Sequence, residues 1–222
     1  MENITRQLEQ LPFFSHLSPS EQEEITQKSM IRTCKEGDIL HDHHAECLGM
    51  VTVLSGKTRV TMQSDDGREI TIYSMEPGDT DILSAACVIN QITFDSMMVA
   101  DEDCEVLVIP AIVISKMEKE NIYLHSYIYE LTAQRFSDAM WAMQQILFLR
   151  MDQRIATGLL DEFARTGDSH ISLTQDKLAR QISSSREVVT RMLKKMEKEG
   201  LLKVGRGCIE LLDVDGLENL LE

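Results

Sequence analysis

The chain has 222 residues, of which 43% are hydrophobic, and its formal net charge is −15 at pH 7. This length is enough for one large domain or for two smaller domains with their own cores. No apolar run approaches the roughly 20 residues that cross a bilayer, and the first ten residues lack the basic and then apolar pattern of a secretory signal. We therefore expect a cytoplasmic protein whose five cysteines are mostly reduced.

The negative charge is unevenly distributed. The segment from Leu173 to Gly207 has nine Lys and Arg against four Asp and Glu, a net charge of +5, so the rest of the chain carries −20. A basic module on an acidic body is typical of a protein that touches nucleic acid with one face only.

Residues 4–30 are predicted to form short helices. Leu8, Leu11 and Phe14 fall on one helical stripe. Ser18 and Pro19 mark a helix start, because Ser caps helices and Pro is tolerated in the first turn.

Residues 31–109 change to short strands about ten residues apart. The predicted strands are 38–40, 49–54, 58–62, 69–73, 99–100 and 105–109, with glycine turns at 36–38, 55–57 and 76–79. This spacing predicts an antiparallel sandwich or barrel.

Residues 122–149 contain no Pro or Gly and predict one long helix. Its near-heptad positions are Leu124, Ile128, Leu131, Arg135, Ala139, Ala142 and Ile146, and the apolar face is widened by Tyr127, Phe136, Met140, Met143 and Leu147. So broad a face must be covered on two sides. We expect one part to pack on the strands and another to pair with a second copy in a parallel coiled coil. The alternative is a helix buried only within its own domain.

Residues 173–200 predict two helices with a tight turn between them. Thr174 would cap the first helix, Ser184 or Ser185 the second, and Gly200 would end it. Arg186, Glu187, Thr190 and Arg191 lie in the first two turns of the second helix, where a recognition helix meets base edges. The alternative is an ordinary helical hairpin with a solvated charged face.

Residues 201–212 predict two short strands around the glycine turn 205–207. A hairpin after a recognition helix is the wing of a winged helix. Its tip carries Arg206, which is suited to contact a phosphate.

At these residues the sequence resembles the Crp–Fnr family of bacterial transcription regulators. Ser185 to Leu193 resembles the family's SRExxxRxL recognition helix, and the DQRIAxxLL pattern from Asp152 to Leu160 resembles the first helix of its DNA-binding domain. The EGD, LSGK and PGD turns resemble those of the cyclic-nucleotide-binding β-roll. One departure is Ser183, where the family commonly has Gly in the turn, so Ser would carry a backbone cost if its φ is left-handed.

The resemblance implies an α+β fold: an N-terminal double-stranded, jelly-roll-like β-roll sensor (1–120), a long dimerisation helix and hinge (121–150), and a C-terminal winged helix-turn-helix (151–222). It implies a homodimeric, sequence-specific regulator, not an enzyme. Its partners would be a palindromic operator in double-stranded DNA and RNA polymerase, with no membrane. The expected DNA-binding residues are Thr174, Ser184, Ser185, Arg186, Glu187, Thr190, Arg191 and Arg206.

The sensor departs from members that bind cyclic AMP. Those carry a Gly-Glu-Leu phosphate cassette and then an Arg-Ser or Arg-Thr pair, but here 79–83 replaces the cassette, and Phe94 and Asp95 fall at the pair. Ala139 and Met140 replace the polar pair that reads adenine. We therefore predict no useful cyclic AMP binding. The cysteines, at 34, 47, 87, 104 and 208, share no iron–sulfur spacing, and four of them are expected to be small buried hydrophobes.

Two further sensor hypotheses stay open. The segment from His41 to Cys47 could bind a transition metal, as in cupin-like proteins, although a polar turn between strands is favoured. No residue is singled out as a haem ligand. No cofactor or metal is predicted. The sensor would bind a small uncharged or aromatic effector in an apolar pocket, or it would bind no effector. The alternative is that the apolar residues of this pocket are ordinary core packing. Its candidate residues are Leu83, Phe94, Met97, Met98, Tyr127, Leu131 and Met140.

Overall fold

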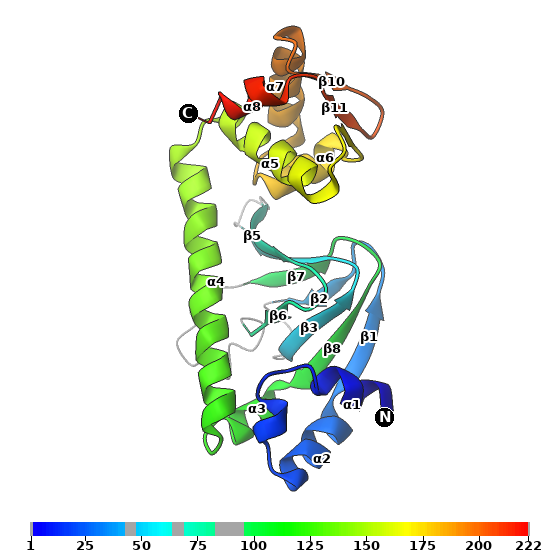
Figure 1. The fold of residues 1–222 in the computed structure, drawn as a ribbon, viewed down its shortest axis with the longest axis vertical. Coiled ribbons are helices and arrows are strands. Elements are labelled where there is room, and N and C mark those ends of the chain that lie inside the picture. The colour runs from blue at the N-terminus through cyan, green and yellow to red at the C-terminus, as the bar shows by residue number, and fades with distance from the viewer. Residues whose placement is uncertain (1, 43–47, 64–68, 83–95, 222) are drawn as a thin grey trace. The chain divides into compact units, whose positions relative to one another are not determined.

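The computed structural model describes residues 2–42, 48–63, 69–82 and 96–221. The chain separates into two compact units (Figure 1). The first comprises Met1–Arg68 and Ile72–Met140, and the second comprises Glu69–Thr71 and Trp141–Glu222. No helix in the described ranges is long and apolar enough to cross a membrane.

The first unit is built on two antiparallel sheets. One sheet has the order β1-β8-β3-β6 and the other the order β2-β7-β4-β5. The strands are β1 (Met30–Cys34), β2 (Ile39–His41), β3 (Gly49–Ser55), β4 (Thr58–Gln63), β5 (Glu69–Met75), β6 (Thr80–Asp81), β7 (Met97–Ala100) and β8 (Cys104–Pro110). The expected strands are present. Strands β1 and β6 were not predicted, and the two-residue β6 is too short to have a period that could be detected.

Strands β3 and β8 are buried on both faces. Val51 and Val106 belong to the core between the two sheets, whereas Met50 and Leu107 belong to a second core on the other face. Successive side chains of a strand point to opposite faces, so both faces need apolar residues. This explains the continuous apolar runs of these two strands.

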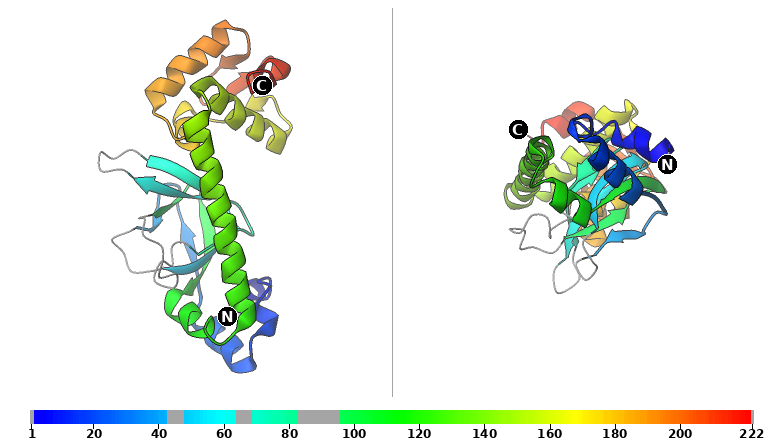
Figure 2. Two further views of the ribbon diagram at one scale, coloured as in Figure 1. Left: turned by 90° about the vertical axis from the view of Figure 1, so that its left-hand side faces the viewer. Right: turned by 90° about the horizontal axis from the view of Figure 1, so that it is seen from below.

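Helices cover that second face. They are α1 (Glu2–Leu8), the 3-10 helix η1 (Phe14–His16), α2 (Pro19–Lys28) and α3 (Ala111–Met117). The right-hand view of Figure 2 shows them in front of the strands at one end of the unit. Ser18 caps α2 as predicted, and its N–H donates to Glu21 Oε2 at 2.7 Å in a reciprocal capping box.

The long helix α4 (Ile122–Phe148) has 27 residues, as the sequence predicts. Its buried side chains are Leu124, Ile128, Leu131 and Arg135. Arg135 is only 4% exposed. It donates from Nη2 to the Thr80 carbonyl and from Nη1 to Asp138 Oδ2, each at 2.8 Å, and its guanidinium lies 4.6 Å from the centre of the Tyr73 ring. Polar contacts thus join apolar packing in holding the first half of α4 to the β-sheets.

The second unit is mostly helical. Its elements are α5 (Met151–Thr166), β9 (His170–Ile171), α6 (Gln175–Gln181), α7 (Arg186–Lys198), β10 (Leu202–Val204), β11 (Ile209–Leu211) and α8 (Val214–Glu218). The strands form a small sheet in the order β10-β11-β9. One core joins all these elements, with Ile155, Leu178, Val189, Leu202 and Leu217 fully buried. The α+β fold of β-roll, long helix and winged helix-turn-helix is therefore confirmed.

Candidate nucleic-acid interface

Side-chain caps fix the starts of α6 and α7. Thr174 Oγ1 accepts from the Lys177 N–H at 3.1 Å, and Ser185 Oγ accepts from the Val188 N–H at 3.4 Å. Ser185, rather than Ser184, is therefore the cap of the second helix. Each cap satisfies one of the backbone donors that a helix start leaves without an intrahelical partner.

The turn between α6 and α7 is a Schellman motif. The Ser184 N–H donates to the Ala179 carbonyl at 2.8 Å, and the Ser183 N–H donates to the Arg180 carbonyl at 3.1 Å. Ser183 has a φ of 52°. The left-handed angle that makes glycine common at this position is thus adopted here by a serine.

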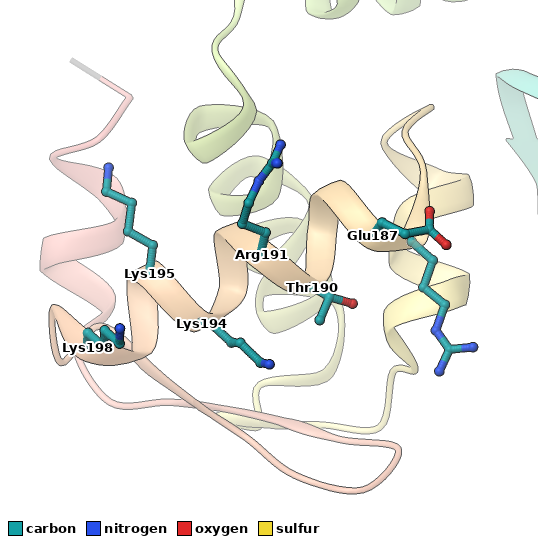
Figure 3. Close-up of a pocket in the computed structure, with 7 residues that line it drawn as sticks. Glu187, Thr190, Arg191, Lys194, Lys195 and Lys198 are labelled. Atoms are coloured by element: carbon teal, nitrogen blue, oxygen red, sulfur yellow. The ribbon is translucent and has the colours of Figure 1, made fainter.

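Helix α7 has one buried face and one charged face. Val189, Leu193 and Met196 are at most 1% exposed and pack into the core of the unit. The opposite face is lined by Arg186, Glu187, Thr190, Arg191, Lys194, Lys195 and Lys198. Figure 3 shows Arg191 and Lys195 projecting from one side of the helix, and Thr190 and Lys194 from the other. Packing on Val189 and Leu193 therefore directs the cations outward.

Most cations of this face have no acidic partner among the residues that the structure describes. Lys195 lies 3.7 Å from Glu199. Within the described parts of the chain, Arg186, Arg191 and Lys194 make no ion pair, and each is exposed. Their guanidinium and ammonium groups are free to meet an anionic or hydrogen-bonding partner outside the chain.

Thr190 differs from its neighbours on this face. It is half-buried, and its Oγ1 donates to Gln175 Oε1 at 2.5 Å. The bond joins α7 to the first residue of α6. Gln175 was not among the predicted site residues, because only the folded turn brings it beside Thr190.

The wing packs against α7. Val204 of β10 pairs with Ile209 of β11, and the Val204 N–H donates to Glu197 Oε1 of α7 at 2.9 Å. Arg206 is exposed at the tip. A single pocket is lined by residues from α6, α7 and the tip, namely Leu173, Thr174, Gln175, Asp176, Arg186, Gly205, Arg206 and Gly207. Folding thus brings together Thr174, Arg186 and Arg206, which were predicted separately.

Comparisons with known proteins agree with this architecture. Residues 31–121 match the cyclic nucleotide-binding domain family, and residues 153–220 match the Crp-like helix-turn-helix domain family. A crystal structure of a Crp/Fnr-family protein from Eubacterium rectale is 35% identical, with a TM-score of 0.89, over 96% of this chain and 99% of that one. This chain belongs to the Crp/Fnr family.

Two curated relatives come from Thermus thermophilus. The transcriptional regulator SdrP is 27% identical over 77% of this chain and 82% of the relative. The cyclic AMP receptor protein is 23% identical over 94% of this chain and 96% of the relative. The chain is a Crp/Fnr-type transcriptional regulator with a helix-turn-helix DNA-binding domain and a cyclic nucleotide-binding domain, and its relatives are regulators rather than enzymes.

The residues of the expected effector pocket are dispersed. Met98 is buried between the sheets, whereas Leu131 and the half-buried Tyr127 pack in the core beneath the helices. Met97 is half-buried and Met140 is 42% exposed. Leu83 and Phe94 lie outside the described residues, as does Asp95. The pocket stays a prediction.

The hypothetical metal ligands are described only in part. His41 ends β2, and the residues from 43 to 47 lie outside the described ranges. No group of three His, Cys, Asp or Glu suited to a metal occurs among the residues that the structure describes.

Cys34 and Cys104 are buried and face each other across β1 and β8, while Cys208 is half-exposed.

Proposed function

We propose that this Crp/Fnr regulator binds an inverted-repeat operator as a homodimer and inserts α7 of each copy into the major groove. The observation that carries the proposal is the exposed start of α7, where Arg186 and Arg191 have no ion-pair partner among the described residues. Arginine forks onto O6 and N7 of guanine, and the Glu187 carboxylate can accept from the amino group of cytosine. Thr174, Ser184, Ser185 and Arg206 would lie beside the phosphates.

Helix α4 supports the homodimer. Tyr129, Phe136, Met140, Met143 and Leu147 are each at least 42% exposed. Tyr129, Phe136 and Met143 are seven residues apart, and so are Met140 and Leu147, so these side chains form a heptad row beside the buried row. An exposed heptad row of large apolar side chains is what a second helix covers in a coiled coil.

We propose that the sensor responds to an effector other than cyclic AMP. Asp81 stands in the segment where cyclic-AMP-binding members carry their phosphate cassette, and it is completely buried. Its carboxylate accepts from the Tyr73 hydroxyl at 2.6 Å. A buried carboxylate there disfavours a second anion, since like charges repel most strongly where water is excluded.

The proposed function is tested by fluorescence anisotropy on a labelled duplex with palindromic GTGA-type half-sites and on a shuffled duplex. We expect tighter binding to the palindrome and a steep loss of affinity as salt rises, because phosphate contacts release counterions. The double variant Arg186→Ala, Arg191→Ala should bind both duplexes equally. Equal binding of both duplexes by the wild-type protein would contradict the proposal.

A further inference from the structure

The turn at Ser183 lacks two features that usually stabilise a Schellman motif. A left-handed φ is unfavourable for serine, because its Cβ crowds the following carbonyl oxygen. The motif also often includes an apolar contact between the residues at the positions of Ala179 and Ser184. Here Ala179 is small and Ser184 is polar, so this apolar contact is weak. Another interaction is needed to hold the start of α7 in this geometry.

Arg154 of α5 supplies that interaction. Its Nη2 donates to the carbonyl oxygens of Ile182 and Ser183, the second at 3.0 Å. These carbonyls belong to the last residue before the left-handed position and to the left-handed residue itself. Burial lowers the pKa of Arg154, because removal from water penalises the charged guanidinium. The cation is thus partly desolvated against the turn.

Gly158, one helical turn after Arg154, lets α5 approach closely. A Cβ at Gly158 would lie 3.2 Å from Ile182 Cγ2 and 3.4 Å from Leu178 Cδ1. A glycine inside a helix weakens it, so a close contact of this kind gives a physical reason for the residue. The same Ile182 therefore packs its side chain against Gly158 and gives its carbonyl to Arg154.

We propose that Arg154 is a positioning residue for DNA binding: it holds the left-handed turn at Ser183 and thereby sets the direction of α7 relative to α6. Arg154 makes no base contact in this account. The predicted effect of Arg154 on operator affinity rests on the proposed function. The link between Arg154 and the turn at Ser183 can be tested without DNA.

The test compares full-length wild type with Arg154→Met, Arg154→Lys, Ser183→Gly and the double variant Arg154→Met, Ser183→Gly. Arg165→Met is the control, because it removes the same charge from an exposed site on α5, where the side chain pairs with Glu162. Operator affinity is measured by anisotropy. Hydrogen exchange of the Ser184 amide, whose N–H donates to Ala179, reports the turn directly.

Arg154→Met should lower operator affinity about tenfold and speed exchange of the Ser184 amide, while the amide of Val189 in α7 stays protected. Arg154→Lys should have a smaller effect, since an ammonium lacks the planar fork of the guanidinium. Ser183→Gly in the Arg154→Met background should restore most of the affinity, because glycine adopts the left-handed angle without strain. Arg165→Met should behave as wild type.

Two results would overturn the proposal. One is an unchanged Ser184 exchange rate in both Arg154 variants. The other is an equal loss of affinity with serine and with glycine at position 183, which would make Arg154 a direct DNA contact. If the wild-type protein bound no operator, the exchange measurements would still decide whether Arg154 holds the turn.

Discussion

At the scale of single residues, we propose that the exposed cations of the second unit divide into base readers and phosphate contacts. Arg186 lies at the start of α7, whereas Arg206 lies on the wing tip. Arg186→Ala should cost about 1–3 kcal/mol on the operator and relax the preference at one base pair. Arg206→Ala should weaken all duplexes equally and reduce the salt slope by about 1. Binding to a panel of single-base variants of the operator measures both, and equal losses on every duplex in both variants would contradict the division of roles.

The buried thiols give a second prediction at this scale. Burial and the neighbouring Cys34 raise the pKa of Cys104 to about 11. At pH 8 about a thousandth of the Cys104 side chains are therefore in the reactive thiolate form, and this fraction rises as the pH approaches 11. Iodoacetamide should modify the half-exposed Cys208 well before Cys34 or Cys104. Peptide mass spectrometry after timed labelling checks this, and equal labelling of Cys104 and Cys208 in the folded protein would contradict it.

The sequence predicts some residue roles better than others. Caps such as Thr174 depend on local backbone geometry, so their positions can be read from neighbouring residues. The sequence left Ser184 and Ser185 both open, and the structure selects Ser185. The bonds from Thr190 to Gln175 and from Arg154 to Ser183 span 15 and 29 positions, so no local pattern reveals them.

At the scale of elements, α4 has a buried row of side chains and an exposed one. The buried row packs within the first unit, and we propose that the exposed heptad row pairs with that of a second copy. Phe136→Glu places a charge in the middle of the exposed row, so it should convert the dimer to monomers. Ser137→Glu, an exposed neighbour off the row, is the matched control and should leave the dimer intact. Sedimentation velocity reports the mass, and an unchanged mass for Phe136→Glu would exclude this row as the interface.

The polar contacts between β5, β6 and α4 give a prediction on stability. The Tyr73 hydroxyl donates to the fully buried Asp81, and burial raises the pKa of Tyr73 well above its usual value, so it stays protonated through neutral pH. Tyr73→Phe should lower the free energy of unfolding by about 1–3 kcal/mol, because a buried carboxylate loses a donor. Tyr123→Phe, where the side chain is 52% exposed and lies off the heptad row, is the control. Urea denaturation measures both, and equal stabilities would contradict this account.

Element prediction succeeded where the pattern was long. The period of α4 and the caps of α2, α6 and α7 are visible in the sequence. Helices α3 and α8 and strands β1, β6 and β9 were not predicted. These have two to seven residues each, too few for a period to stand out, and their formation depends on packing against distant segments.

At the scale of the whole molecule, charge is divided between regions. The chain carries −15 overall, while the segment from Leu173 to Gly207 carries +5. Long-range repulsion from the acidic remainder should disfavour non-specific wrapping along DNA, whereas the basic face still binds phosphates at short range. We therefore expect sequence-specific binding to depend on the proposed base contacts of α7 more than on the net charge.

Selection of bound sequences from a randomised duplex library by the wild-type protein tests whether two copies of α7 read an inverted-repeat operator. Two copies of α7 that read adjacent major grooves predict an enriched inverted repeat, with half-sites centred about 10 base pairs apart or a multiple of that. Arg186→Ala should lose the preference at one symmetric pair of positions. Enrichment of a single unrepeated site, or a motif unchanged by Arg186→Ala, would contradict the account.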